Sequence, residues 1–408
     1  MKKTVLFSAG VWVAALGYFV DIYDLLLFSI VRETSLTDLG YSATQREAYG
    51  LLLINIQMFG MLIGGILWGI MGDKKGRLSV LFGSILLYSL ANLLNGIAHD
   101  IYSYAFYRFI AGVGLAGELG AGITLVAESL PKEKRGWGTM IVATIGVSGA
   151  VFANLSFKLI GDWRMCYFLG GGLGMMLLLL RIGVMESGLY KEVEKSNIRR
   201  GDFLQLFKKK VTLLKYIRCI LIGLPTWFVI GILVTFSPEF ARPEHLNIQG
   251  KIVGGDAIMY AYMGITLGDF LCGLASQYLQ SRKKALYLFM GITIIGILGF
   301  FGSAGESATQ LYTYIFLMGF GTGFWAIVVT NAAEQFGTNI RATVATTVPN
   351  FIRGALPLIT LLYAFLQQYM SKIESAQLVA VLIILLPLLA IYYSEETFAK
   401  DLNYTESL

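Results

Sequence analysis

The chain is poor in cysteine, in histidine and in charge. Its three cysteines are an odd number and lie far apart in apolar stretches, so a disulfide framework is excluded and no metal-ligand spacing is visible. Its two histidines, His99 and His245, fall in predicted outer loops. There is no H-x-x-x-H pair, nucleophile elbow, P-loop or dinucleotide-binding glycine fingerprint. We therefore expect no enzyme, no metal and no cofactor.

Only 14% of the residues are charged and 56% are hydrophobic, which lies outside the range of soluble domains. Apolar runs of about 20 residues can cross a bilayer as helices. Twelve such runs predict an all-α integral membrane protein. They are residues 7 to 31, 48 to 71, 78 to 98, 102 to 127, 138 to 160, 164 to 185, 215 to 238, 254 to 279, 286 to 303, 310 to 332, 343 to 366 and 375 to 393.

The basic residues are distributed unevenly between the predicted loops. With the first residues inside, twenty-three Lys and Arg fall in inner segments and five in outer ones, namely Arg32, Arg46, Arg242, Lys251 and Lys372. Short basic loops stay on the cytoplasmic side. We therefore expect a multi-pass protein of the bacterial cytoplasmic membrane with both termini in the cytoplasm. Its expected partners are the lipid bilayer and a small molecule, with no nucleic acid, and the expected state is a monomer.

A polar and basic stretch, residues 187–214, divides the chain into two parts with six predicted spans each. The first part is 1–186, and the second is 215–408 with a short cytoplasmic tail. A basic segment of this kind would lie on the anionic inner leaflet. The sequence thus predicts two helical bundles joined by a cytoplasmic linker.

The loop between the second and third runs reads G-x-x-x-D-K-x-G-R and contains Gly69, Asp73, Lys74, Gly76 and Arg77. Its spacing resembles the loop signature of the major facilitator superfamily of secondary transporters. The resemblance implies twelve transmembrane helices in two pseudo-symmetric six-helix bundles. It also implies that these five residues belong to a cytoplasmic gate. In the second half of the chain, Gln277 occupies the position that corresponds to Asp73 in the first half. The expectation of a second gate contact at this position is therefore weaker.

Three further motifs resemble the same superfamily, in particular its metabolite:proton symporters, sugar porters and organic ion transporters. The pattern R-x-x-x-G-x-G-x-x-G-E runs from Arg108 to Glu118. The loop from Glu128 to Arg135 and its counterpart from Glu334 to Arg341 resemble the family's paired cytoplasmic loops. By this resemblance the four loop residues are expected to be gate residues.

Charged residues inside the apolar runs are costly and usually functional. Asp21 and Asp24 lie three residues apart in the first run, and we expect at least one of them to carry a proton. Arg108 needs a counter-ion, and the resemblance implies that it faces Asp24. Glu118 either titrates or forms a hydrogen bond within the bundle while neutral. Two alternatives remain open. Arg108 could extend its charged end to the outer membrane interface, and the acids could have structural roles.

Arg353, in the eleventh run, is expected either to clamp an anionic substrate or to pair with Asp269, since guanidinium matches a carboxylate bidentately. Further residues are expected to contact the substrate, although such side chains often only pack. They are Asn350, Tyr23, Gln57, Trp227, Tyr262, Asp269 and Trp325.

Together these features predict a secondary active transporter. It would move a small polar metabolite, an organic anion with a carboxylate, by proton-coupled alternating access. The alternatives are an exporter or importer of a chelator or drug-like molecule, a zwitterionic osmolyte porter and a sugar porter. The sequence also leaves open whether sodium replaces the proton.

Overall fold

The computed structural model describes residues 9–75, 77–118, 135–186, 205–337, 340–398 and 400. Long apolar helices joined by short connections make up this part of the chain. The helices are α1 (Ala9–Asp38), α2 (Ala43–Lys75), α3 (Arg77–Gly96), α4 (Ile101–Leu115), α6 (Arg135–Val147), α7 (Gly149–Ile160), α8 (Trp163–Glu186), α9 (Gln205–Lys208), α10 (Lys210–Phe228), the π-helix η3 (Val229–Val234), α11 (Ser237–Phe240), α12 (Gly254–Tyr278), α13 (Arg282–Gly302), α14 (Ala308–Thr322), α15 (Trp325–Glu334), α16 (Arg341–Gly354), α17 (Leu356–Leu366) and α18 (Lys372–Tyr393).

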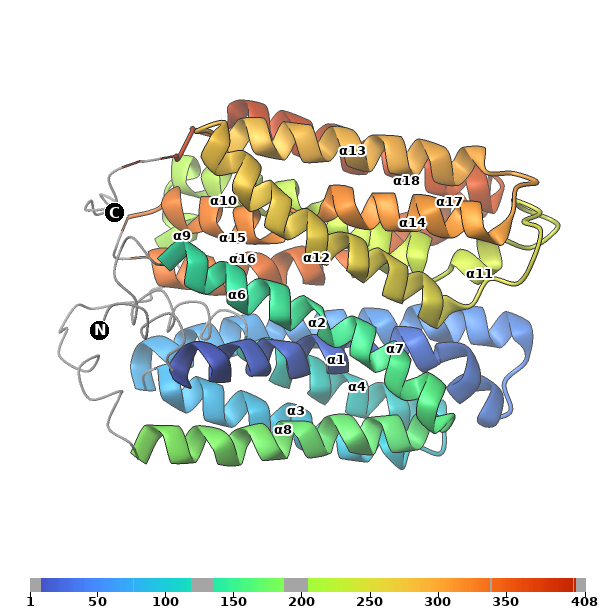
Figure 1. Cartoon of the computed structure of the whole chain (residues 1–408), viewed down its shortest axis with the longest axis horizontal. Coiled ribbons are helices and arrows are strands. Elements are labelled where there is room, and N and C mark those ends of the chain that lie inside the picture. Colours follow the sequence, from blue (N-terminus) through green and yellow to red (C-terminus); the bar gives the residue numbers. More distant parts are fainter. Residues whose placement is uncertain are drawn as a thin grey trace.

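The helices form two lobes that lie side by side, with α1 to α8 in one and α10 to α18 in the other (Figure 1). In the first lobe α2 packs on α4, α3 on α8, and α1 on α6, α7 and α8. In the second lobe α12 and α13 pack on α14, and α10 packs on α18. The lobes meet mainly where α2 contacts α16 and where α12 contacts α1, α6 and α7. This is the predicted arrangement of two six-helix bundles.

Within the described residues, eleven helices are long and apolar enough to cross a membrane. They match eleven of the twelve predicted runs. The remaining run, 102 to 127, is described only as far as Glu118, and its helix α4 ends at Leu115. Helix α1 continues to Asp38, beyond the predicted end at residue 31. The sequence had suggested an outer loop for Arg32, but the residue lies inside this helix.

Glycines allow the helix backbones to approach closely at the centre of the molecule. An added Cβ on Gly60 or Gly64 of α2 would collide with the backbone of α4 at Phe109 or Val113. An added Cβ on Gly65 would lie 2.7 Å from the Cβ of Asn350 on α16. Such small residues bring membrane helices into van der Waals contact. The glycines of α2 therefore fix the packing within the first lobe and its contact with the second.

The three cysteines are buried in the apolar interior. Cys166 lies in α8, Cys219 in α10 and Cys272 in α12, and none forms a disulfide. They behave as small apolar packing groups. This agrees with the absence of a cysteine framework in the sequence.

Candidate functional site

Helices of the second lobe are interrupted near the centre of the molecule. Pro225 lies inside α10, and the π-helix η3 follows directly. Helix α14 ends at Thr322 and α15 begins at Trp325, while α16 ends at Gly354 and α17 begins at Leu356. Proline and π-helical turns are common causes of such interruptions. In membrane proteins irregular backbone is tolerated where protein buries it or where it lines a cavity.

The interrupted helices bring aromatic side chains together with an arginine. The Arg353 guanidinium lies 5.8 Å from the Trp227 ring and 5.7 Å from the Trp325 ring. Arg353 is only 1% exposed, and its Nε and Nη1 atoms have no hydrogen-bond acceptor. The indole N–H groups of both tryptophans also lack an acceptor. The cluster therefore holds a buried positive charge with donors that are not used.

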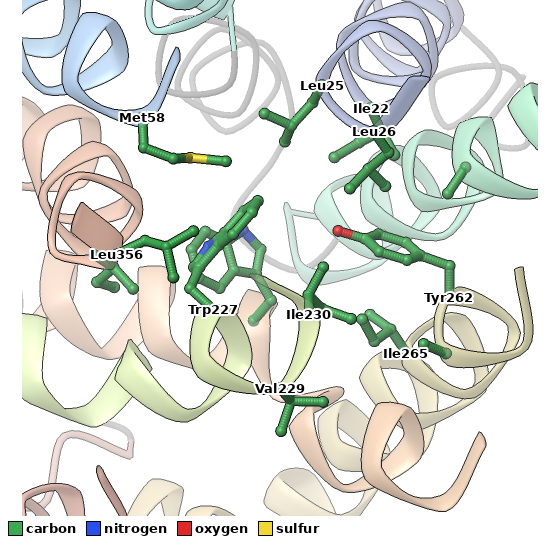
Figure 2. Close-up of a cluster of buried hydrophobic side chains, with 14 of the residues drawn as sticks. Ile22, Leu25, Leu26, Met58, Trp227, Val229, Ile230, Tyr262, Ile265 and Leu356 are labelled. Carbon is green, nitrogen blue, oxygen red and sulfur yellow. The ribbon is translucent and has the colours of Figure 1, made fainter. Parts of the chain in front are cut away.

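Side chains from both lobes surround this cluster. Figure 2 shows Trp227 near its middle and the hydroxyl group of Tyr262 pointing toward the centre. Apart from the Tyr262 hydroxyl and the Trp227 indole nitrogen, the labelled side chains are apolar. They are Ile22, Leu25 and Leu26 of α1, Met58 of α2, Val229 and Ile230 of η3, Ile265 of α12 and Leu356 of α17.

Asp21 of α1 lies in the other lobe, and its charge interacts with that of Arg353. Its side chain is fully buried, and neither carboxylate oxygen has a hydrogen-bond partner. The charges that act on it are the Arg353 guanidinium first and Glu118 second. Tyr18, one turn earlier on α1, interacts electrostatically with Asp21, Arg353, Asp269 and Tyr262, which places all of them in one neighbourhood. Opposite charges from the two lobes thus meet here without forming an ion pair.

The expected ion pair between Arg108 and Asp24 is not formed. Arg108 donates a hydrogen bond to Gln57 and lies 4.6 Å from the centre of the Phe28 ring. Asp24 is fully buried, and its carboxylate has no hydrogen-bond partner, although Arg108 still acts on its charge. The prediction of a direct pair is wrong for this conformation, because the Gln57 carbonyl and the Phe28 face take the guanidinium. Gln57 is accordingly a partner of Arg108.

Glu118 forms an ion pair with Arg181 of α8 that has two hydrogen bonds, one of them 3.1 Å from Nη1 to Oε2. The pair is buried against Gly17 of α1, where an added Cβ would collide with both side chains. Arg181 lies within α8, and not in a loop. Its place in the predicted run 164 to 185 was a signal that it needs an intramembrane partner.

Asp269 does not pair with Arg353. Its Oδ1 accepts a hydrogen bond of 3.0 Å from the backbone N–H of Ala326, in the first turn of α15. The alternative of an ion pair between Arg353 and Asp269 is therefore wrong, because the helix end takes this carboxylate. Arg353 is left without an acidic partner in its own lobe among the described residues.

Two other predicted substrate contacts have structural hydrogen bonds. The Asn350 amide donates to the backbone carbonyl of Ala116 at 2.9 Å and so connects the lobes, while its Oδ1 stays unpaired. The Tyr23 hydroxyl donates to the Cys166 carbonyl at 2.9 Å, inside the first lobe. The structure thus places Asn350 at the contact between the lobes, three residues before Arg353 on α16. Tyr23 points toward α8, so the interpretation of Tyr23 as a substrate contact is not supported.

The predicted gate residues are described only in part. Glu334 accepts from Arg282 at 3.1 Å and from Thr397 at 2.7 Å, within the second lobe. An added Cβ on Gly69 would lie 3.7 Å from the Thr347 methyl group, where α2 meets α16. The remaining members fall outside the described residues or have side chains that do. They are Gly76 and Glu128, and the side chains of Asp73, Lys74, Arg77, Arg135 and Arg341.

The opposite end of the molecule is closed by ion pairs between the lobes that sequence reasoning missed. Arg32 of α1 pairs with Glu239 of α11 at 2.6 Å, and both are buried. Lys158 of α7 pairs with Asp256 of α12 at 2.5 Å, and Lys372 of α18 pairs with Glu47 of α2. No local sequence signal joins Arg32 to Glu239, because 207 positions separate them.

Comparisons with known proteins agree with this geometry. A sequence model of the Major Facilitator Superfamily matches residues 10–359. The sialic acid transporter NanX of Escherichia coli strain K12 is 25% identical over 79% of this chain and 82% of its own. The niacin transporter NiaP of Acinetobacter baylyi is 26% identical over 81% and 80%. The gentisate transporter of Corynebacterium glutamicum is 23% identical over 83% and 78%.

Solved structures show the same fold. The proton:xylose symporter XylE bound to 6-bromo-6-deoxy-D-glucose has a TM-score of 0.75 and 15% identity, covering 99% of this chain and 98% of its own. A partially occluded inward-open form of XylE from Escherichia coli has a TM-score of 0.72, also at 15% identity, over 98% and 100%. At this identity the likeness concerns the arrangement of the helices alone.

Proposed function

Since the chain belongs to the major facilitator superfamily, we propose that its substrate is a small organic anion with a carboxylate group and that a proton gradient drives its uptake. The chain is a multi-pass membrane transporter for a small molecule and not an enzyme. In the proposal it lies in the bacterial cytoplasmic membrane as a monomer with both termini inside. Residues 1–186 and 215–408 are its two rocking units, and residues 187–214 join them.

The observation that carries the proposal is the unpaired Arg353. A guanidinium stays charged at any accessible pH, and a buried charge is costly without a partner. Among the described residues of its own lobe no acid pairs with Arg353, and Asp269 is held by the end of α15. A substrate carboxylate can accept from the unused nitrogens of Arg353. The Tyr262 hydroxyl and the unpaired indole N–H groups of Trp227 and Trp325 supply further donors in the cluster.

Relatives support an anionic substrate. The three related transporters described above are named for sialic acid, niacin and gentisate, and each of these molecules carries a carboxylate. The planar Trp227 and Trp325 rings, 5.8 Å and 5.7 Å from the Arg353 guanidinium, offer flat apolar surfaces for the rest of such a molecule. A guanidinium close to aromatic faces is also attracted to the rings, which keeps it in place.

The proposed coupling is a competition for Arg353. In the ionised state Asp21 compensates the Arg353 charge across the interface between the lobes. Protonation of Asp21 removes that compensation, and a substrate carboxylate then takes its place. The net charge of the cluster is the same in both states, so the loaded transporter can change conformation without an unpaired charge. Asp24, also buried and unpaired, is a second candidate proton carrier beside Arg108 and Gln57.

Uptake into proteoliposomes tests the proposal. The radiolabelled compounds would be niacin, gentisate and sialic acid, with betaine and xylose as a zwitterion and a neutral sugar, under an imposed pH gradient. We expect accumulation of at least one carboxylate, which stops when a protonophore collapses the gradient. Accumulation of xylose alone would contradict the anion, and accumulation that requires sodium but no pH gradient would contradict the proton.

A further inference from the structure

The tenth membrane span is broken in the middle, and a carboxylate closes the break. Helix α14 ends at Thr322, Gly323 and Phe324 follow, and α15 starts at Trp325. The Asp269 side chain of α12 accepts a hydrogen bond from the Ala326 N–H at 3.0 Å, and the Trp325 N–H also stabilises its charge. Asp269 thus caps a helix that begins inside the membrane-spanning bundle.

The cap is held by direct contact between backbones. An added Cβ on Gly323 would lie 2.6 Å from the backbone nitrogen of Asp269 and from the Cα of Gly268. No residue with a side chain fits at Gly323 without moving α12 away from the break. The two glycines therefore let the short Asp269 side chain reach the start of α15.

The first N–H groups of a helix have no partner within that helix. At a helix end in water the solvent satisfies them, but inside a membrane protein a side chain must do so. A carboxylate is well suited, because the helix N-terminus carries partial positive charge. Since Trp325 is the first residue of α15, the same cap fixes where its ring stands, 5.7 Å from the Arg353 guanidinium.

We propose that Asp269 is a positioning residue for the anion site: by capping α15 it holds Trp325 against Arg353. The inference rests on the proposed function, since it assigns Arg353 to the substrate. It also explains why a second charged residue lies near Arg353 without neutralising it. The Asp269 carboxylate binds the N-terminus of α15, which carries partial positive charge. The Arg353 guanidinium therefore remains available to bind the substrate carboxylate.

Three variants test the cap. Asp269→Ala removes it, and Asp269→Asn keeps an oxygen that can accept from the Ala326 N–H. Ser307→Ala is the matched control, because Ser307 caps α14 at the other end of the same span, where its side chain accepts from the Gln310 N–H at 3.3 Å. Trp325 fluorescence, assigned by difference from Trp325→Phe, reports on the site without any ligand. Thermal unfolding of the purified proteins shows whether each variant is folded.

We expect Asp269→Ala to shift the Trp325 emission and to raise KM by about tenfold, the size of a lost helix cap, with a smaller change in maximal rate. The probe is whichever of niacin, gentisate and sialic acid the wild type takes up fastest. Asp269→Asn should restore both the emission and most of the affinity, and Ser307→Ala should change neither.

Two results would overturn the inference. One is an unchanged Trp325 emission in folded Asp269→Ala. The other is an Asp269→Asn variant as defective in uptake as Asp269→Ala but with wild-type emission, which would make the charge itself the important property. If Arg353 variants transport these carboxylates normally, the proposed function fails, while the fluorescence result still decides whether Asp269 holds Trp325.

Discussion

Asp21 and Arg353 are buried opposite charges on opposite lobes, and they act on one another without forming an ion pair. The interior of a membrane protein rarely keeps charges in this condition. An ion pair in this position would use the guanidinium for contact between the lobes. Two unpaired charges leave a place that a third, negatively charged group can enter.

Replacement of Asp21 tests the competition directly. Asp21→Asn keeps the size of the side chain but cannot carry the exchanged proton. We expect accumulation driven by a pH gradient to fall to background, while exchange of labelled for unlabelled substrate at equal pH continues. Uptake and counterflow in the same proteoliposomes measure the two activities. Asp24→Asn, measured in parallel, shows which of the two acids is needed, and normal accumulation in both variants would contradict proton coupling at this site.

Replacement of Arg353 tests the anion clamp. Arg353→Gln should lower uptake of the carboxylate about 100-fold or more, because a charge-assisted hydrogen-bonded pair of this kind contributes about 3 kcal/mol. Arg353→Lys should recover only part of the loss, since an ammonium cannot bind bidentately. Arg164→Gln is the matched control. Arg164 also stacks on a tryptophan, Trp163, at 4.2 Å, but far from the cluster.

If Arg353→Gln left the apparent affinity for the carboxylate unchanged, the guanidinium would have a structural role. A fall in uptake of the same size in Arg164→Gln would point instead to a general loss of folded protein. Size-exclusion profiles of both variants separate these cases.

The closed end of the molecule should be more stable at acidic pH. Burial raises the pKa of the Glu239 carboxyl, although the Arg32 guanidinium acts in the opposite direction. A carboxyl whose pKa is higher in the closed form than in water binds its proton more tightly in the closed form, so protonation favours that form. The contact between α1 and α11 should therefore gain stability as the pH falls and lose it as the pH rises.

Hydrogen exchange measures this change in stability. The protection of residues 240–248, whose backbone N–H groups include Leu246 bonded to the Phe240 carbonyl, should increase as the pH is lowered. Glu239→Gln, which resembles the neutral acid, should show the high protection already at neutral pH. Asp100→Asn, at an acid that caps α4 within one lobe, should behave as the wild type. Protection that does not depend on pH in the wild type would contradict a proton-sensitive contact.

The Glu118–Arg181 pair should matter for stability. Glu118→Gln alone leaves the Arg181 charge buried without compensation, which costs about 3–5 kcal/mol. The double replacement Glu118→Gln with Arg181→Met removes both charges and should be less destabilising than the single one. Thermal unfolding in detergent measures both. Equal stability of Glu118→Gln and the wild type would contradict a stabilising role for the ion pair.

The sequence was a good guide to the fold because its strongest signals are local. The apolar runs predicted the spans, and the loop from Gly69 to Arg77 indicated the hairpin between α2 and α3. Arg353 was also visible, as a cation in an apolar run without an obvious acid. Such signals lie within about 20 residues of one another, the length of one span.

The pairing of charges was predicted poorly, because it depends on which helices are neighbours. Arg181 reaches Glu118 across 63 positions, and Arg32 reaches Glu239 across 207. The family resemblance predicted a pair between Arg108 and Asp24. In the structure Arg108 instead donates a hydrogen bond to Gln57 and lies over the Phe28 ring. The partner of Asp269 was not predicted, because it is a backbone N–H at the break between α14 and α15. A pattern of side chains in the sequence does not indicate such a partner.

The buried cysteines have a practical consequence. All three thiols are shielded in this conformation, at 2% exposure or less, so a membrane-impermeant maleimide would find no native target. Cys166 lies in a helix of the first lobe, and Cys219 and Cys272 lie in two helices of the second. Any alkylation of the unmodified protein would therefore record a departure from this conformation, and the peptide that carries the label would tell which helix had become accessible.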